Sequence, residues 1–124
     1  MVDTSAVIAY RRNSQEALNY FEKAERLYLP TVALGELYYG AYFSPDVERS
    51  LSELEELLPI FTLIQPNHGV AKAYGQIKAR LRQAGIPISE NDLWIAAGAH
   101  YFTVPLLVRD EHFDCVTEIA CLQV

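Results

Sequence analysis

Short apolar runs alternate with amphipathic stretches along the chain, a pattern that predicts an α/β protein. Apolar residues recur at helical spacing or in short runs, which predicts helices over residues 4–12, 14–25, 31–43, 46–58, 67–84 and 90–101 and strands over 1–2, 27–29, 60–64, 106–108 and 118–122. Short strands separated by helices typically form a parallel sheet covered on both faces. We therefore predict a three-layer α/β/α sandwich with a central five-stranded, mainly parallel sheet, formed by residues 1–124 as a single domain.

The first predicted strand is unusually short. Only two residues precede Asp3, whereas strands usually run for about five or six residues. Either the natural start lies upstream of Met1 or the strand is simply short, and the sequence leaves both possibilities open.

Composition supports one domain and narrows the class of protein. With 124 residues, 51% of them hydrophobic, the chain can bury a core without disulfides. No apolar run reaches the ~18–20 residues of a membrane span, and no signal peptide is visible, so we expect a cytoplasmic protein without membrane contact. Cys115 and Cys121 form no metal or redox motif and are expected to be reduced. A net charge of −6 argues against binding nucleic acid by overall charge, but not against an enzyme that acts on it.

Two aspartates directly follow predicted strands. Asp3 follows the first, and Asp110 comes one residue after the strand that ends at Val108. The carboxyl ends of parallel strands share one edge of the sheet, so both acids are expected at that edge, where sites form in α/β folds. Taken singly, each is better explained as a helix cap or a turn residue than as a functional acid.

Glu36 and Asp92 lie on predicted helices. Glu36 shares a helical stripe with Tyr39 and Phe43 and is flanked by Gly35 and Gly40, which suggests a packed face that another backbone approaches closely. The alternative is that the opposite side packs on the core and leaves Glu36 in water. Asp92 is the third residue after Ser89 and fits a capping box, which needs no catalytic role.

Together the four acids predict a metal site. Four carboxylates brought close would repel one another, and a divalent cation removes that repulsion. Oxygen ligands without thiolate or imidazole favour Mg²⁺ or Mn²⁺. The histidines His68, His100 and His112 lack metal-ligand spacing and are expected to be non-ligands.

Four motifs in order resemble a known family. Asp3-Thr4-Ser5, residues 31–40 around Glu36, residues 91–97 around Asp92 and residues 107–113 around Asp110 look like the successive motifs of PIN domains, and most closely of the VapC toxins of toxin–antitoxin pairs. The resemblance implies a catalytic metal site at Asp3, Glu36, Asp92 and Asp110, with Ser5 supporting it. Many relatives have a threonine where this chain has Val108, which removes a hydroxyl near the site.

The resemblance implies hydrolysis of RNA phosphodiester bonds with Mg²⁺ or Mn²⁺, a homodimer, and inhibition by a VapB-like antitoxin. Arg109, beside Asp110, is the basic residue best placed to contact RNA phosphate, whereas the basic residues of 72–82 are expected to be solvated. The side of the 31–43 helix away from Glu36 carries Leu34, Leu37, Tyr38 and Tyr42. It either packs on neighbouring helices or, as the resemblance implies, forms part of a groove for an antitoxin helix.

Two other interpretations remain. One is a non-catalytic PIN-like module that only assembles with protein or RNA partners, suggested by Val108 and the short first strand. The other is a different acidic α/β site, such as a phospho-accepting receiver or an aspartate-nucleophile phosphatase. The phosphatase requires Asp-x-Asp where this chain has Ser5, and the receiver requires a late lysine, yet none follows Lys78. Both fit poorly.

Overall fold

The computed structural model describes all residues from Met1 to Val124. Its α-helices are α1 (Thr4–Arg11), α2 (Gln15–Lys23), α3 (Thr31–Tyr42), α4 (Val47–Leu57), α5 (His68–Gln83) and α6 (Glu90–Phe102). Its strands are β1 (Leu27–Pro30), β2 (Phe61–Ile64), β3 (Leu106–Val108) and β4 (Cys121–Gln123), and the 3₁₀ turns η1 (Leu58–Ile60) and η2 (Glu111–Phe113) complete the chain. None of the helices is both long and apolar enough to cross a membrane.

The strands form two parallel pairs with the N-terminal segment between them. β1 pairs with β2, and β3 pairs with β4. The amide of Val2 donates to the carbonyl of Tyr28 at 2.9 Å, and that of Asp3 donates to the carbonyl of Leu107 at 3.0 Å. Val2 makes only an isolated bridge to Leu107, so the predicted five-stranded sheet is present as two two-stranded sheets linked by this segment. The segment is this short because Asp3 already begins α1.

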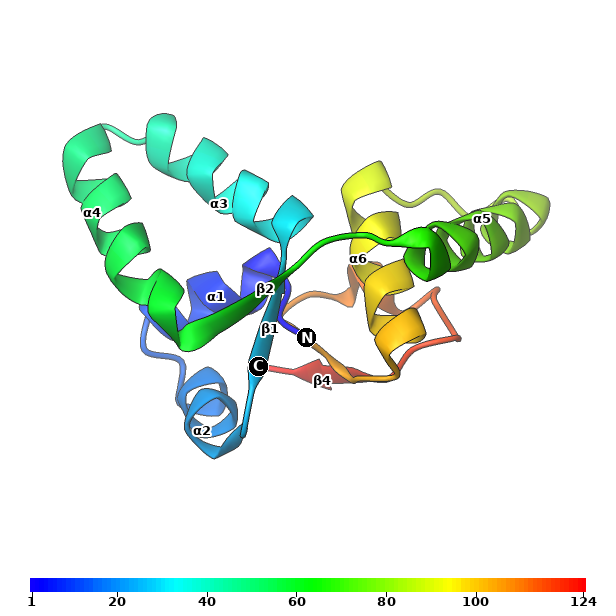
Figure 1. The fold of residues 1–124 in the computed structure, drawn as a ribbon, viewed down its shortest axis with the longest axis horizontal. Coiled ribbons are helices and arrows are strands. Elements are labelled where there is room, and N and C mark those ends of the chain that lie inside the picture. The colour runs from blue at the N-terminus through cyan, green and yellow to red at the C-terminus, as the bar shows by residue number, and fades with distance from the viewer.

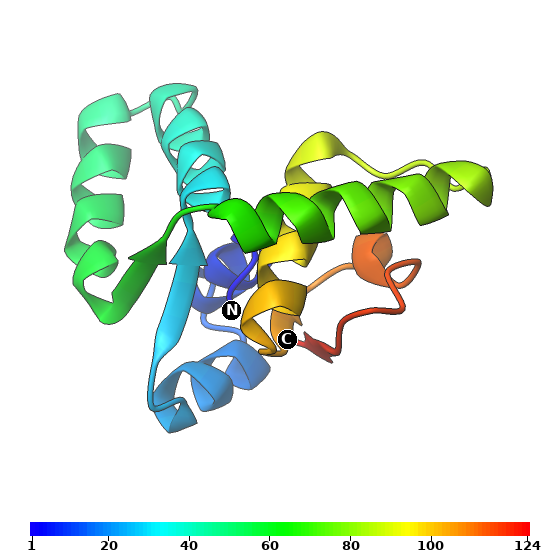
Figure 2. The ribbon, with the colours of Figure 1, turned by 45° about the vertical axis from the view of Figure 1, so that its right-hand side comes forward.

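Helices cover the strands on both sides. α5 and α6 lie on one side, and α1 and α2 on the other (Figure 1). α3 leaves the carboxyl end of β1 and packs against α4 as a hairpin that stands apart from α5, as Figure 2 shows most clearly. The predicted α/β class with helices on two faces is therefore confirmed.

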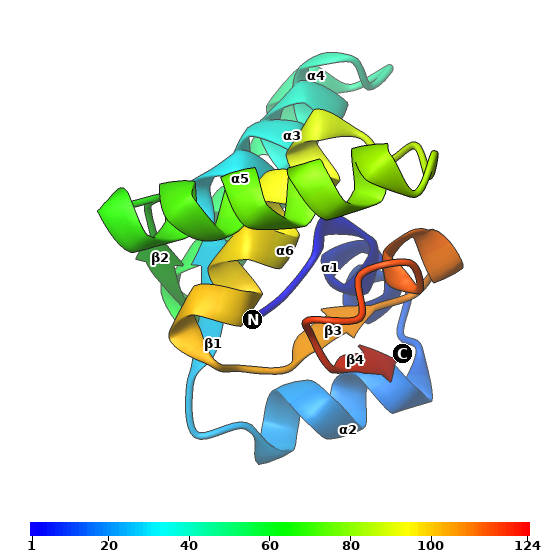
Figure 3. The same ribbon diagram turned by 90° about the vertical axis from the view of Figure 1, so that its right-hand side faces the viewer.

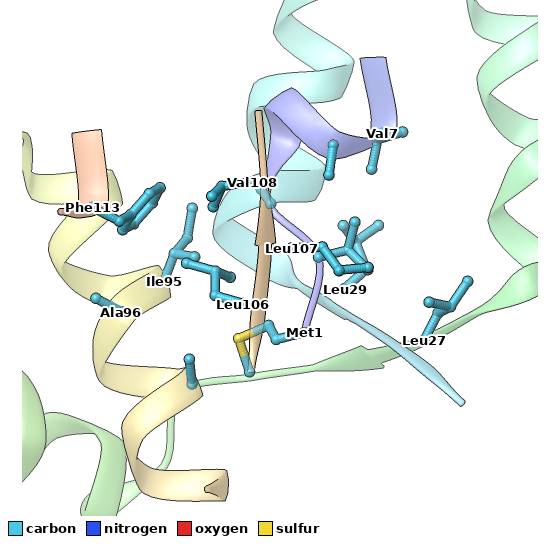
Figure 4. Packing of buried hydrophobic residues seen from close by; sticks show 14 of the residues in the cluster. Met1, Val7, Leu27, Leu29, Ile95, Ala96, Leu106, Leu107, Val108 and Phe113 are labelled. Atoms are coloured by element: carbon cyan, nitrogen blue, oxygen red, sulfur yellow. The ribbon is translucent and has the colours of Figure 1, made fainter. Parts of the chain in front are cut away.

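The core lies between these layers because the strands bury both faces. Every residue of β3 is buried. In Figure 4, Leu106 points toward Ile95 and Ala96 of α6, whereas Leu107 points the other way, toward Leu29. This alternation follows from the two-residue period of a strand, and continuous burial is typical of strands in parallel sheets.

The last predicted strand is misplaced. The structure puts β4 at Cys121–Gln123, beside β3 (Figure 3), whereas residues 117–119 form turns. Glu118, inside the predicted strand, lies in the turn, and its carboxylate pairs with Arg80 of α5. The turns η1 and η2 were not predicted either. Both cysteines are free, as expected.

Candidate metal and catalytic site

Asp3 anchors the site at the start of α1. It is the only buried charged or polar residue, with 5% of its surface exposed. Its side chain caps α1: Oδ2 accepts hydrogen bonds from the amide of Ser5 at 2.9 Å and from the Ser5 hydroxyl. Oδ1 accepts no hydrogen bond from the protein. The interpretation of Asp3 as a helix cap is thus confirmed, and one oxygen remains for a further ligand.

Ser5 connects Asp3 to the loop after β3. Its hydroxyl oxygen also accepts a hydrogen bond from the backbone N–H of Arg109 at 3.0 Å. Asp110, the next residue, caps η2 by accepting the amide of His112 at 3.3 Å. The short network through Ser5 therefore fixes the segment that carries Asp110 relative to Asp3.

Glu36 lies in the second turn of α3 and faces the start of α1. The hydroxyl of Thr4 donates to its Oε1 at 2.9 Å. Partial burial raises the pKa of the Glu36 carboxyl, the charges of Asp3 and Asp92 raise it further, and hydrogen bonds from Thr4 and Asn91 oppose the rise. Glu36 is therefore near both aspartates, as predicted.

The predicted packing of the Glu36 side of α3 is wrong. The stripe through Glu36 is the open side of α3, because Tyr39 and Phe43 are 68% and 78% exposed, while Leu37 is buried. A Cβ added at Gly35 or Gly40 would meet nothing within 4 Å, so no backbone of this chain approaches them closely. Glu36 thus sits at the border of the packed and open sides.

Asp92 joins the group from the first turn of α6. The hydroxyl of Ser89 accepts its amide at 3.2 Å, which confirms the helix cap. Burial raises the pKa of the Asp92 carboxyl; the charges of Asp3 and Asp110 add to that rise, and Ser89 and His112 oppose it. The ring atom Nδ1 of His112 lies 3.9 Å from Asp92 Oδ2 and 3.4 Å from Asp110 Oδ1, between the two carboxylates.

The structure thus brings the four predicted acids to one region. The charges of Asp3 and Asp110 raise the pKa of Asp92, and the charges of Asp3 and Asp92 raise the pKa of Glu36. No group of three or more Asp, Glu, His or Cys side chains is already arranged to hold a metal ion. The arrangement is an electronegative cluster whose acidic groups are held by caps and hydroxyls.

Three residues contact the acids in ways that the sequence did not predict. Thr4 and Asn91 bond to Glu36, and His112 bridges two aspartates. Each lies within two residues of a predicted acid, which is the signal that points to them. Val108, in contrast, is fully buried in β3, so the missing hydroxyl belongs to the core and leaves the Ser5 network intact.

A pocket of about 400 Å³ opens beside Glu36, between α1, α3 and α4. Ile8, Arg11, Leu37 and Gly40 are among the residues that line it. Arg11 is held by Glu53 of α4 at 2.8 Å. The expected separation of a Leu37 face from the Glu36 face is therefore wrong, because both residues border one pocket.

In α/β folds, ligand and catalytic sites form beyond the carboxyl ends of parallel strands, which is where these acids gather. The sequence profile of the PIN domain matches residues 1–119. The chain belongs to the PIN domain family.

Relatives and solved structures of this family resemble the whole chain. Ribonuclease VapC2 of Haemophilus influenzae is 39% identical over 103 residues, which cover 80% of this chain and 76% of that protein. Ribonuclease VapC1 of the same species is 28% identical over 96% of this chain and 92% of its own length. VapBC2 from Rickettsia felis, bound to a DNA fragment from its promoter, superposes with a TM-score of 0.90 at 25% identity and covers 99% of this chain and 96% of that one.

Proposed function

We propose that the chain is an endoribonuclease of the VapC type, the toxin of a toxin–antitoxin pair, that hydrolyses RNA with Mg²⁺ or Mn²⁺. The observation that carries the proposal is the grouping of Asp3, Glu36, Asp92 and Asp110, where burial and mutual repulsion raise the pKa of two of them. The ribonuclease relatives support the reaction class.

The donor set fits a hard divalent cation. All four acids offer carboxylate oxygens, and Oδ1 of the buried Asp3 has no protein donor. A cation at this place would offset the repulsion that raises the pKa of Glu36 and Asp92. We therefore assign Asp3, Glu36, Asp92 and Asp110 as its ligands. When bound, the cation supplies Lewis-acid chemistry, which acidifies water and stabilises charge on the scissile phosphate.

Residues of this chain have three further roles: they hold the site in place, accept a proton and contact the phosphate. Ser5 holds Asp3 and the Arg109 segment in one geometry. A carboxylate oxygen that the cation leaves free would accept the proton of the attacking water. Arg109 is exposed, and its charge acts on Glu16 without forming an ion pair with it. Its place beside Asp110 suits its guanidinium to contact the phosphate next to the cleaved bond.

Cleavage of total RNA tests this function. Purified protein is expected to cut RNA at defined positions when Mn²⁺ or Mg²⁺ is present and to stop when EDTA is added. Mapping the new 5′ ends with each of the four acids amidated in turn checks the site. Folded protein that cuts RNA equally well in EDTA, or that never cuts RNA, would refute the proposal, and the second result would favour the non-catalytic module.

Replacing Ser5 with alanine is expected to weaken cation binding or cleavage about 10–100-fold, the usual effect of removing a group that orients a ligand. The hydroxyl is the shared partner of Asp3 and the Arg109 amide. The measurement is Mn²⁺ affinity by calorimetry together with the cleavage rate. Ser5→Thr keeps the hydroxyl and serves as the control, and a Ser5→Ala variant with wild-type affinity and rate would contradict this role.

We also propose a VapB-like antitoxin as partner, with the pocket beside Glu36 as its docking place. Two features favour an inserted helix: the apolar side chains of Ile8 and Leu37, and the uncovered backbone at Gly40. A basic side chain of such a helix would face Glu36. The related VapBC complexes support a partner of this class. The homodimer implied by the resemblance is part of the proposal and is measured by light scattering.

A further inference from the structure

The basic residues of the chain gather on α5. This helix holds Lys72, Lys78, Arg80 and Arg82 and no acidic residue, in a chain whose net charge is −6. Arg80 is tied to Glu118 and Lys78 to Glu90, whereas Arg82 makes no ion pair. Lys78 and Arg82 are one turn apart and share a face of the helix. A concentration of cations on one helix is typical of a surface that meets a nucleic-acid backbone.

A second pocket of about 400 Å³ lies against that face, between α5, α6 and the loop that joins them. We call it the α5–α6 pocket. Leu81, Ile86, Ile88 and Leu93 give it an aliphatic wall, and Lys78, Arg82 and Glu90 are the charged residues that line it. The pocket therefore offers an apolar interior with cations at its border.

The loop that closes the pocket has a fixed shape. Gly85 adopts φ +71°, a conformation that favours glycine. The amides of Gly85 and Ile86 donate to the carbonyls of Arg82 and Leu81 at 3.1 and 2.9 Å. These bonds end α5 and turn the chain back toward α6 (Figure 2). The pocket is thus formed before any ligand arrives.

The α5–α6 pocket and Asp92 share the first turn of α6. Glu90 and Leu93 line the pocket, whereas Asp92 lies between them in sequence and is turned to another side of the helix. The residues of one turn rise about 5 Å along the axis, and a helix with its side chains is about 10–12 Å across. An RNA strand that crosses this turn of α6 from Asp92 therefore passes the pocket.

From this placement we infer that the α5–α6 pocket binds one unpaired nucleobase of the RNA substrate, next to the cleaved bond, with Arg82 on the adjoining phosphate. The inference rests on the proposed ribonuclease function and adds the element that selects the cleavage position. Unstacked bases bind to apolar surfaces through their flat faces, and cations at the border follow the backbone. Glu90 does not repel the phosphates strongly because Lys78 holds it at 2.7 Å.

The test uses oligonucleotides that contain a mapped cleavage site and a single abasic nucleotide at each flanking position in turn. For the wild-type protein, kcat/KM is expected to fall about tenfold or more at one position, the scale of losing one bound base. Ile86→Trp, which fills the pocket, is expected to lower kcat/KM on intact RNA by a similar factor and to abolish the difference between intact and abasic substrates. Arg82→Gln is expected to raise KM without changing which position is sensitive.

The controls distinguish a wrong pocket assignment from a wrong ribonuclease function. Ile60→Trp is the matched variant, because Ile60 and Ile86 have similar exposure (44% and 38%) and Ile60 lies away from this pocket. Ile86→Asp opposes an apolar occupant without filling space and is expected to act like Ile86→Trp. If both Ile86 variants retain the wild-type abasic pattern while RNA is still cut, the pocket assignment is overturned alone. If the wild-type protein cuts no RNA, both proposals fail.

Discussion

Asp92→Asn is expected to reduce RNA cleavage by about 10²-fold or more, the usual loss when one preorganised electrostatic group leaves a catalytic centre. The substitution removes a carboxylate whose pKa is raised by the charges of both Asp3 and Asp110. The α6 cap remains, because it is formed by the Ser89 hydroxyl and the backbone amide of residue 92. The variant should therefore fold normally.

The same substitution is expected to raise the melting temperature in the absence of metal. The pKa of Asp92 is higher in the folded protein than in the unfolded chain, chiefly because of burial. As the pH rises from the ordinary carboxyl pKa through the raised one, the unfolded chain loses its proton before the folded one does, so stability falls. At neutral pH the ionised carboxylate therefore destabilises the folded protein, and replacing it with a neutral amide removes this destabilisation.

Melting scans in EDTA and cleavage rates measured on the same preparation decide the point. Asp46→Asn is the matched control, since Asp46 caps α4 outside the site and asparagine caps equally well. It should leave cleavage unchanged. An Asp92→Asn protein that melts far below the wild type would show that the carboxylate is structural rather than part of a repulsive cluster.

Mn²⁺ is expected to stabilise the protein, and the gain should shrink as the solution is acidified. A ligand bound only to the folded state adds about 2.7 kcal/mol at about 100 times its Kd. Cation binding requires ionised carboxylates. Because the pKa values of Glu36 and Asp92 are raised, proton competition begins at higher pH than for ordinary carboxylates.

As the solution is acidified, stability in EDTA should therefore rise while the stabilisation by Mn²⁺ shrinks. As the pH falls from neutral toward the raised pKa values of Glu36 and Asp92, the melting temperature in EDTA should rise relative to that in Mn²⁺, so that the two curves converge. Scanning calorimetry with and without Mn²⁺ measures both. Glu36→Gln should largely remove the Mn²⁺-dependent part. A Mn²⁺ effect of equal size at all pH values, or one unchanged by Glu36→Gln, would place the cation elsewhere.

The sequence predicted the acids better than it predicted the surroundings of Glu36. Asp3 and Asp110 follow strands, so their common edge could be inferred from the strand pattern alone, and the caps at Asp3 and Ser89 came from local motifs. The open face of α3 could not be inferred, because aromatic and glycine residues at helical spacing look alike whether covered or bare. That choice depends on where α1 and α4 pack.

The fold was predictable to a similar depth. Helices with strong apolar spacing, such as α5, were placed correctly within a few residues. The position of β4 was not, because it is defined by pairing with β3, a tertiary contact without a local signal in the chain. The division of the sheet also depends on a tertiary detail, the start of α1 at Thr4, directly after Val2 and Asp3.

The hydrogen bond between Ser5 and Arg109 has a consequence for the order of synthesis. Its partners are 104 residues apart, and β3 is itself secured by β4 and by the amide of Val124, which donates to Val108 at 2.9 Å. A chain emerging from the ribosome presents Asp3 first but lacks Asp110 and the strand that supports it until the partners 104 residues further on have been made. Chains grow at about 5–20 residues per second. The acidic cluster therefore forms only after β3 and β4 have emerged, and a chain terminated before them does not contain it.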